Sequence, residues 1–215
     1  MSSGSIQSEG VREAKQARSK QTRDKLIGAL DSLLKEKSFA EIGVAEIAGR
    51  AGCAVGSVYR RFENKDAFVP VLLEVTAQRM ADRMREMGPL RLSREGDLKG
   101  DLEQVAQRAW TVLSGESHLL RLAHQQARME NPVCDTAMPA LMDGVRQAIE
   151  AALRQRAGDR AEAERKRAAR WATYFLITPL MEKALYPDRS PANFLQTGGE
   201  EVGREMAALI ASRLG

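Results

Sequence analysis

The stretch IGVAEIAGRAGCAVGSVYRRFENKDAF, residues 42–68, decides the fold of this chain. It opens with a short helical pattern that stops at Gly52, where a helix commonly ends in left-handed backbone. A second short helix follows, with Val58 and Phe62 one turn apart on its inward face. Asn64 then stands where it can cap the next helix. Two short helices joined by a glycine turn predict a helix-turn-helix, which sets its second helix in the major groove of DNA.

An amphipathic helix is predicted upstream of this motif, because Leu26, Leu30, Leu33 and Leu34 recur at the spacing of one helix face. The three helices then share one small core, which is marginal alone and needs a larger partner domain. The expected core residues are Leu26, Leu30, Leu33, Phe39, Ile42, Ile47, Ala51, Val58 and Phe62.

At many fixed offsets this stretch resembles the TetR/AcrR family of bacterial transcriptional regulators. The matching segments are Ile42-Gly43-Val44, Ile47-Ala48, Ala51-Gly52-Cys53, Gly56-Ser57-Val58-Tyr59-Arg60-Arg61-Phe62 and Asn64-Lys65-Asp66. The rest of the chain is similar to the family only in length and helical character. The resemblance implies an all-α protein, with an N-terminal three-helix helix-turn-helix DNA-binding domain and a C-terminal helical domain for ligand binding and dimerisation.

The resemblance also implies which residues meet DNA. Tyr59 would contact a phosphate or a base at the groove edge, and Lys65 would hold a phosphate together with backbone amides. Arg60 and Arg61 would contact the DNA backbone. The full expected set is Gly43, Val44, Ala45, Ala54, Val55, Gly56, Ser57, Tyr59, Arg60, Arg61 and Lys65.

Two kinds of departure from the family pattern affect this expectation. Ala45 and Val55 stand where long polar base-reading side chains are common in the family. Base reading would then fall to contacts with thymine methyl groups, to Ser57, to a close approach of the Gly56 backbone, or to Arg60. Gly43 replaces a usual Thr cap, and Ala54 replaces a Ser cap at a cost of about 0.5–2 kcal/mol.

The chain has 215 residues, 43% of them apolar, and a net charge of +4. Residues 1–66 hold 12 basic and 9 acidic side chains, and six of the basic ones lie between Val11 and Lys25. We expect a flexible basic N-terminal arm at 1–18, the DNA-binding domain at 19–66, and an effector-binding and dimerisation domain at 67–215. The arm either lies along DNA or enters its minor groove, or it is a solvated tail.

Cys53 and Cys134 have no paired spacing, which indicates a reducing cytoplasm. Cys53 either fills a valine-sized core site or acts as a redox trigger. The sequence offers no apolar run that spans a bilayer, no metal-ligand spacing, no phosphate-binding glycine loop and no nucleophile elbow. It therefore predicts no membrane partner, no metal, no cofactor and no enzyme activity.

Helical patterns continue through the remaining chain without a strand signal. The expected helices are Lys65 to Met87, Asp97 to Leu113, Ser117 to Met129, one opened by Asn131-Pro132 and ending near Arg156, Asp159 to Leu185, and Thr197 to Leu214.

The segment from Trp171 to Leu185 is apolar nearly all the way round, so it must be buried on all sides. Val202, Met206 and Leu209 give the final helix an apolar stripe. Paired with a two-fold copy, these two helices would form a four-helix bundle, as the family resemblance also implies. The expected result is a homodimer whose recognition helices sit about 34 Å apart and face a palindromic operator in double-stranded DNA.

The middle helices would enclose a small-molecule effector if they behave as the family does, and a Met-rich, apolar lining would favour a mostly apolar one. The candidate lining residues are Trp110, His118, Leu122, Gln125, Met129, Met142, Trp171, Tyr174, Phe175 and Thr178. We therefore expect a repressor that the effector releases from its operator. The alternative is an architectural or effector-independent DNA-binding dimer with a packed, dry middle.

Overall fold

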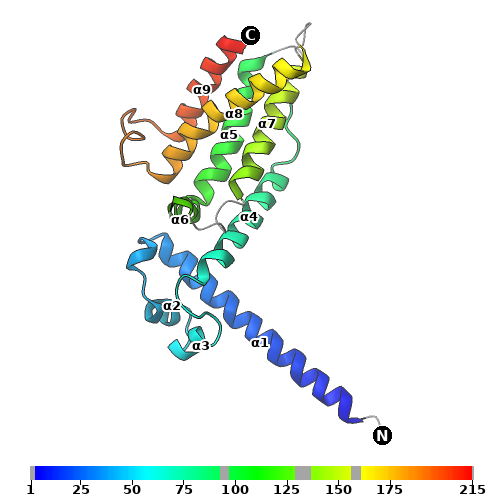
Figure 1. Ribbon diagram of the computed structural model, residues 1–215, viewed down its shortest axis with the longest axis vertical. Helices are drawn as coiled ribbons and strands as arrows, with labels where there is room; N and C mark the ends of the chain where they lie inside the picture. The colour runs from blue at the N-terminus through cyan, green and yellow to red at the C-terminus, as the bar shows by residue number, and fades with distance from the viewer. Residues whose placement is uncertain (1–2, 93–96, 129–136, 156–160, 215) are drawn as a thin grey trace. The chain divides into compact units, whose positions relative to one another are not determined.

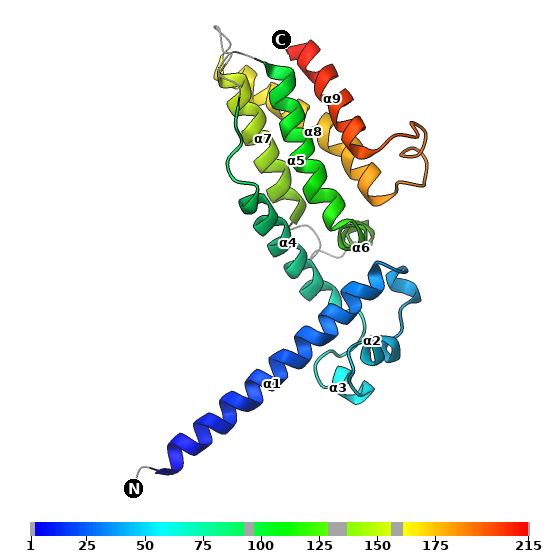
Figure 2. The same ribbon diagram turned by 180° about the vertical axis from the view of Figure 1, so that it is seen from behind.

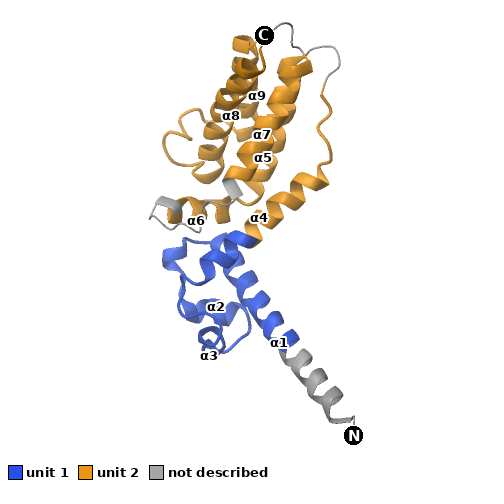
Figure 3. Cartoon of the chain, turned by 45° about the vertical axis from the view of Figure 1, so that its right-hand side comes forward, with its two compact units in different colours: residues 1–74 blue, residues 75–215 orange. Residues whose placement is uncertain are grey.

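The structure is a computed structural model that describes residues 3–92, 97–128, 137–155 and 161–214. Within these residues the chain is helical and contains no strand, which confirms the all-α expectation. It divides into two compact units, residues 1–74 and 75–215 (Figure 3).

The first unit consists of one long helix followed by three short helical elements, and it also includes the start of the next helix. They are α1 (Ser3–Leu34), the 3-10 turn η1 (Phe39–Glu41), α2 (Val44–Arg50) and α3 (Val55–Tyr59). Leu26, Leu30 and Leu33 of α1 are fully buried, together with Ile47 of α2 and Val58 of α3. The expected core of the helix-turn-helix is thus confirmed, except that Ala51 is half-buried.

The helix α1 is much longer than the one predicted from its leucines. It is continuous from Ser3 (blue in Figures 1 and 2), so the segment expected to be a flexible arm is helical in its backbone. Its 32 residues give it a length of about 48 Å. The physical reason lies in residues 11–25, which contain no proline or glycine and many good helix formers.

The second unit is a helical bundle. Its first helix, α4, begins within residues 1–74 and continues into this unit. Its elements are α4 (Phe68–Glu86), α5 (Leu98–Gly115), α6 (Ser117–Arg128), α7 (Ala137–Gln155), α8 (Glu162–Leu185) and α9 (Gly199–Leu214). These bounds agree with the predicted helices to within a few residues, but the proposed start signals Asn131-Pro132 and Asp159 lie outside the described residues.

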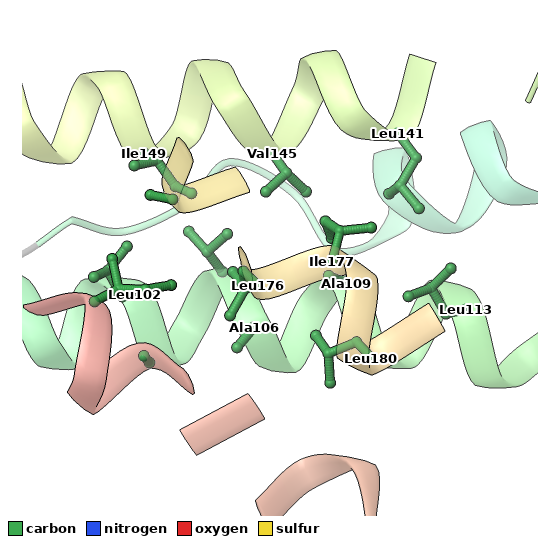
Figure 4. Close-up of a cluster of buried hydrophobic side chains, with 14 of the residues drawn as sticks. Leu102, Ala106, Ala109, Leu113, Leu141, Val145, Ile149, Leu176, Ile177 and Leu180 are labelled. Atoms are coloured by element: carbon green, nitrogen blue, oxygen red, sulfur yellow. The ribbon is translucent and has the colours of Figure 1, made fainter. Parts of the chain in front are cut away.

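The helix α5 lies at the centre of this bundle, against α7, α8 and α9 (Figures 1 and 2). Its buried side chains meet those of α7 and α8 in one continuous core (Figure 4). The labelled core residues are Leu102, Ala106, Ala109, Leu113, Leu141, Val145, Ile149, Leu176, Ile177 and Leu180. Of the helices in the described ranges, none is both long and apolar enough to cross a membrane.

Candidate nucleic-acid interface and effector pocket

The turn between α2 and α3 has the geometry expected from the sequence. Gly52 has a φ of +63°, the left-handed backbone that a glycine adopts without strain. Gly43 is the N-cap of α2 and Ala54 is the N-cap of α3, and neither makes a side-chain cap hydrogen bond. The Ala54 carbonyl instead accepts a bond from the Ser57 amide at 2.8 Å. A five-residue helix without a side-chain cap depends on packing for its stability.

The outer face of α3 presents polar and apolar groups to solvent. Tyr59 is 58% exposed and Val55 is 40% exposed, while Val58 between them points into the core. Arg60 is exposed as well, and its Nη2 donates to the Ser57 hydroxyl at 2.7 Å. A phenol, a guanidinium and a branched apolar side chain on one short helix suit contacts with phosphates and thymine methyl groups.

The half-buried Arg61 connects α3 to α1. Its Nη1 donates to the Ser57 carbonyl at 3.0 Å, and its Nε donates to the Ser19 carbonyl at 3.4 Å. The guanidinium is thereby held in the space between the two helices.

Lys65 takes an inward position that the sequence did not predict. Its Nζ donates to the carbonyls of Phe39 at 2.8 Å, Ile42 at 3.1 Å and Ala40 at 3.5 Å. It also lies 4.5 Å from the centre of the Phe39 ring, a cation–π distance. An ammonium group can donate three hydrogen bonds, and here three carbonyls accept them. The ammonium group is therefore already hydrogen-bonded within the domain, and the phosphate contact expected for Lys65 stays a prediction.

An exposed ion pair fastens the last turn of α2 to the end of α1. Arg50 donates to both carboxylate oxygens of Glu36, at 2.8 Å and 3.0 Å, and to the Ser32 hydroxyl at 3.1 Å. These hydrogen bonds lower the pKa of the Glu36 carboxyl below its ordinary value. Since the pair is open to water, it orients α2 more than it stabilises it.

Residues 26–71 match the bacterial regulatory proteins of the tetR family. The match takes in the core half of α1, both helices of the helix-turn-helix and the start of α4. This segment is a tetR-family domain. The resemblance read from residues 42–66 is thereby confirmed.

Solved structures of tetR-family fold extend the likeness to both units. A TetR-family transcriptional regulator from Mesorhizobium loti is 18% identical, covers 91% of this chain and 97% of its own, and has a TM-score of 0.61. The fatty acid degradation regulator FadR of Bacillus halodurans is 14% identical, with coverage of 87% and 93% and a TM-score of 0.60. FadR of Bacillus subtilis, in complex with stearoyl-CoA, is 16% identical, with coverage of 87% and 97% and a TM-score of 0.55. At these identities the likeness concerns the fold. No curated protein matches the chain.

The tetR-family domain therefore carries most of the expected DNA-binding set on its surface. Seven of these residues are exposed: Gly43, Ala45, Ala54, Val55, Gly56, Tyr59 and Arg60. Val44, Ser57, Arg61 and Lys65 are half-buried. Of the four, Arg61 and Lys65 have guanidinium or ammonium groups already bonded to backbone carbonyls within the domain.

The second unit contains an apolar pocket between α4, α5 and α7. Its volume is about 150 Å³, and Arg108 is the charged residue among those that line it. Arg108 donates from Nη1 to the Gly88 carbonyl at 2.7 Å and from Nη2 to the Pro89 carbonyl at 3.0 Å. It thus ties α5 to the turn that ends α4. The lining residues are Met84, Met87, Leu90, Val105, Arg108, Ala109, Val112, Leu141, Gly144, Val145 and Ala148.

The structure does not gather the expected effector residues around this pocket. Trp110 packs over Gly199 at the start of α9, and Leu122 is buried. His118 and Met142 are half-buried and Gln125 is exposed, while Met129 lies outside the described residues. The remaining four, Trp171, Tyr174, Phe175 and Thr178, lie on the exposed face of α8.

Sequence reasoning missed Arg108 and the methionines at the end of α4. Met80, Met84 and Met87 do recur at helical spacing. That signal indicates an inward face, but it does not distinguish a packed core from a pocket. The described residues contain no group of three or more His, Cys, Asp or Glu side chains placed to hold a metal ion.

Replacing Lys65 with methionine tests its inward role. We expect Lys65→Met to lower the free energy of unfolding by about 1.5–3 kcal/mol, because the variant removes a charged hydrogen-bond donor and leaves its carbonyl acceptors without that partner. The measurement is denaturant unfolding, with Lys35→Met, an exposed lysine of the same unit, as the control. Equal stability of the two variants, with weakened DNA binding by Lys65→Met alone, would favour a phosphate contact instead.

Proposed function

We propose that this chain is a transcriptional repressor that binds a palindromic operator as a homodimer and is released by a small, mostly apolar effector. The observation that carries the DNA-binding part is the outward placement of Tyr59 and Arg60 on α3 of a tetR-family domain. Lys65 acts in this proposal as a support for that surface rather than as its main phosphate contact, because its ammonium is bonded to carbonyls.

The dimer is proposed from the exposed apolar surface of α8 and α9. Trp171 is 55% exposed and stacks on Phe175 with ring centroids 5.6 Å apart, and Leu209 is 60% exposed. These residues line a groove of about 670 Å³, whose charged lining residues are Glu164, Arg167 and Arg213. A second copy is the occupant we propose, since a two-fold axis lets the same patch cover itself and pair unlike charges.

The effector is proposed to bind the pocket lined by Met84 and Met87. This pocket has about the volume of a cavity that holds benzene, so it suits a compact apolar molecule. The Bacillus subtilis FadR structure contains stearoyl-CoA, whose long acyl chain would need far more room. A ligand that spreads the pocket would act on the end of α4, which Arg108 fastens to α5.

An effector-independent, architectural DNA-binding dimer remains the alternative. It would use the same α3 surface and the same α8 and α9 groove. The pocket at the end of α4 favours the effector-controlled regulator, and the third test below separates the two. No enzyme activity is proposed.

The first test removes the Arg60 guanidinium. Arg60→Ala should weaken binding to a duplex selected by the wild-type protein from a random pool, and should lower the slope of log K against log[salt] by about 0.9 per protomer. Lys99→Ala, which removes an exposed positive charge from the second unit, is the control. An unchanged slope for Arg60→Ala would remove this residue from the phosphate contacts.

The second test places a charge in the proposed dimer groove. Leu209→Asp should give a monomer in sedimentation, because a carboxylate would be buried without a partner in the interface. Leu195→Asp is the control, since Leu195 is also an exposed leucine but does not line the groove. A Leu209→Asp variant that sediments as a dimer would rule out this interface.

The third test fills the pocket from Gly144. A Cβ at this position would have no heavy atom within 4 Å, so a side chain can be added at the pocket wall. Benzene should raise the melting temperature of the wild type by about 2–4 °C for each kcal/mol of binding. Gly144→Leu should abolish the shift, whereas Gly144→Ala, which adds one methyl group, should keep it. No shift in any of the three proteins would favour the effector-independent alternative.

A further inference from the structure

In the part of α1 before the core, two of the four basic side chains of residues 16–25 lie on the side of the helix that continues the core face. Gln16, Lys20 and Arg23 are spaced four and three residues apart, so they share one side of the helix. Leu26 and Leu30 continue this spacing, and they are the residues that α1 buries against the helix-turn-helix. The face that forms the core therefore continues as a basic face once the helix has left the core.

This basic face forms one wall of a groove, and Arg61 forms the other. The groove has a volume of about 600 Å³ and is lined by Gln16, Ala17, Ser19, Lys20, Arg23 and Arg61. Arg61 is fixed there by its bonds to the Ser19 and Ser57 carbonyls at 3.4 Å and 3.0 Å. Arg61 directly follows Arg60 in the chain and is bonded to the Ser57 carbonyl of α3. The groove therefore adjoins the proposed DNA-binding surface.

The charge of the groove selects the class of partner. Its lining contains the basic side chains of Lys20, Arg23 and Arg61, whereas Asp24, the one acidic residue of residues 16–25, does not line it. A groove lined by three cationic side chains and no large apolar residue suits a chain of phosphates better than a hydrophobic peptide or a lipid tail. Its continuity with Tyr59 and Arg60 favours the phosphates of the same duplex.

We propose that the groove between α1 and Arg61 is a second DNA-backbone contact, in which Lys20, Arg23 and Arg61 hold phosphates outside the footprint of α3. The proposal rests on the proposed function. It concerns a part of α1 that precedes residue 26, where the match to the tetR family begins. Because phosphates carry no sequence information, this contact adds affinity without adding specificity.

The test compares two double variants that remove the same charge from the same helix. Lys20→Ala/Arg23→Ala alters the groove face, whereas Arg18→Ala/Lys25→Ala alters the opposite, exposed face. We expect the groove variant to lose about tenfold in affinity near 0.1 M salt and to lower the salt slope by about 2 per protomer. The loss should be equal for a duplex selected by the wild-type protein and for a random-sequence duplex. The opposite-face variant should leave both the affinity and the salt slope close to the wild-type values.

Each outcome decides the proposal. Alanine favours helix, and circular dichroism with melting temperature verifies that both variants remain folded. Equal losses from the two double variants would show a general effect of net charge and overturn the groove contact, while Arg60→Ala would still report on α3. A loss confined to the selected duplex would also overturn it, because it would indicate base reading. A wild-type protein that binds neither duplex would overturn the proposed function together with this inference.

Discussion

The burial of Val58 and Phe62 is the constraint on which the proposed DNA surface depends. The helix α3 has five residues, too few to persist in water through its own hydrogen bonds. Val58 is 1% exposed, and Phe62 stacks on Phe68 with ring centroids 3.7 Å apart. Tyr59 and Arg60 face solvent because their neighbours in the chain face the core. The short helix thus has a fixed orientation only as long as α1, α2 and the start of α4 enclose those two side chains.

The helix-turn-helix was predictable because its determinants are local. Gly52 and Asn64 act on backbone within a few residues of themselves. Both expected features are present, since Gly52 is left-handed and the Asn64 side chain accepts a hydrogen bond from the Ala67 amide at 3.0 Å. The positions of Lys65 and Arg61 were not predictable, since their acceptors lie far away along the chain, at Phe39 and Ser19. Sequence spacing identifies the face of a helix, but it does not identify the carbonyl that a long cationic side chain reaches across a domain.

In the second unit, too, some features could be predicted from the sequence and others depend on how the helices pack. The apolar character of residues 171–185 predicted that α8 needs cover on every side, and in the single chain Trp171, Tyr174 and Phe175 remain exposed. The pocket could not be predicted, because it arises where α4, α5 and α7 do not fully interdigitate. Gly144 and Ala148 leave room there. Small side chains in a helix also permit close packing with a neighbouring helix, so the sequence pattern alone does not predict a pocket.

In the proposed function, the helix α4 would be the physical route for control. It is one helix from Phe68 to Glu86, with its first turns in the DNA-binding unit and its last turns in the bundle. Phe68 supports the α3 end through its contact with Phe62, and Met84 lines the pocket at the other end. A helix transmits displacement along its axis because its hydrogen bonds couple each turn to the next. If an effector favours one position of α4 and the operator favours another, each must weaken binding of the other by the same free energy. Control of this kind requires no contact between effector and DNA, only a preference of each for a different position of the same helix.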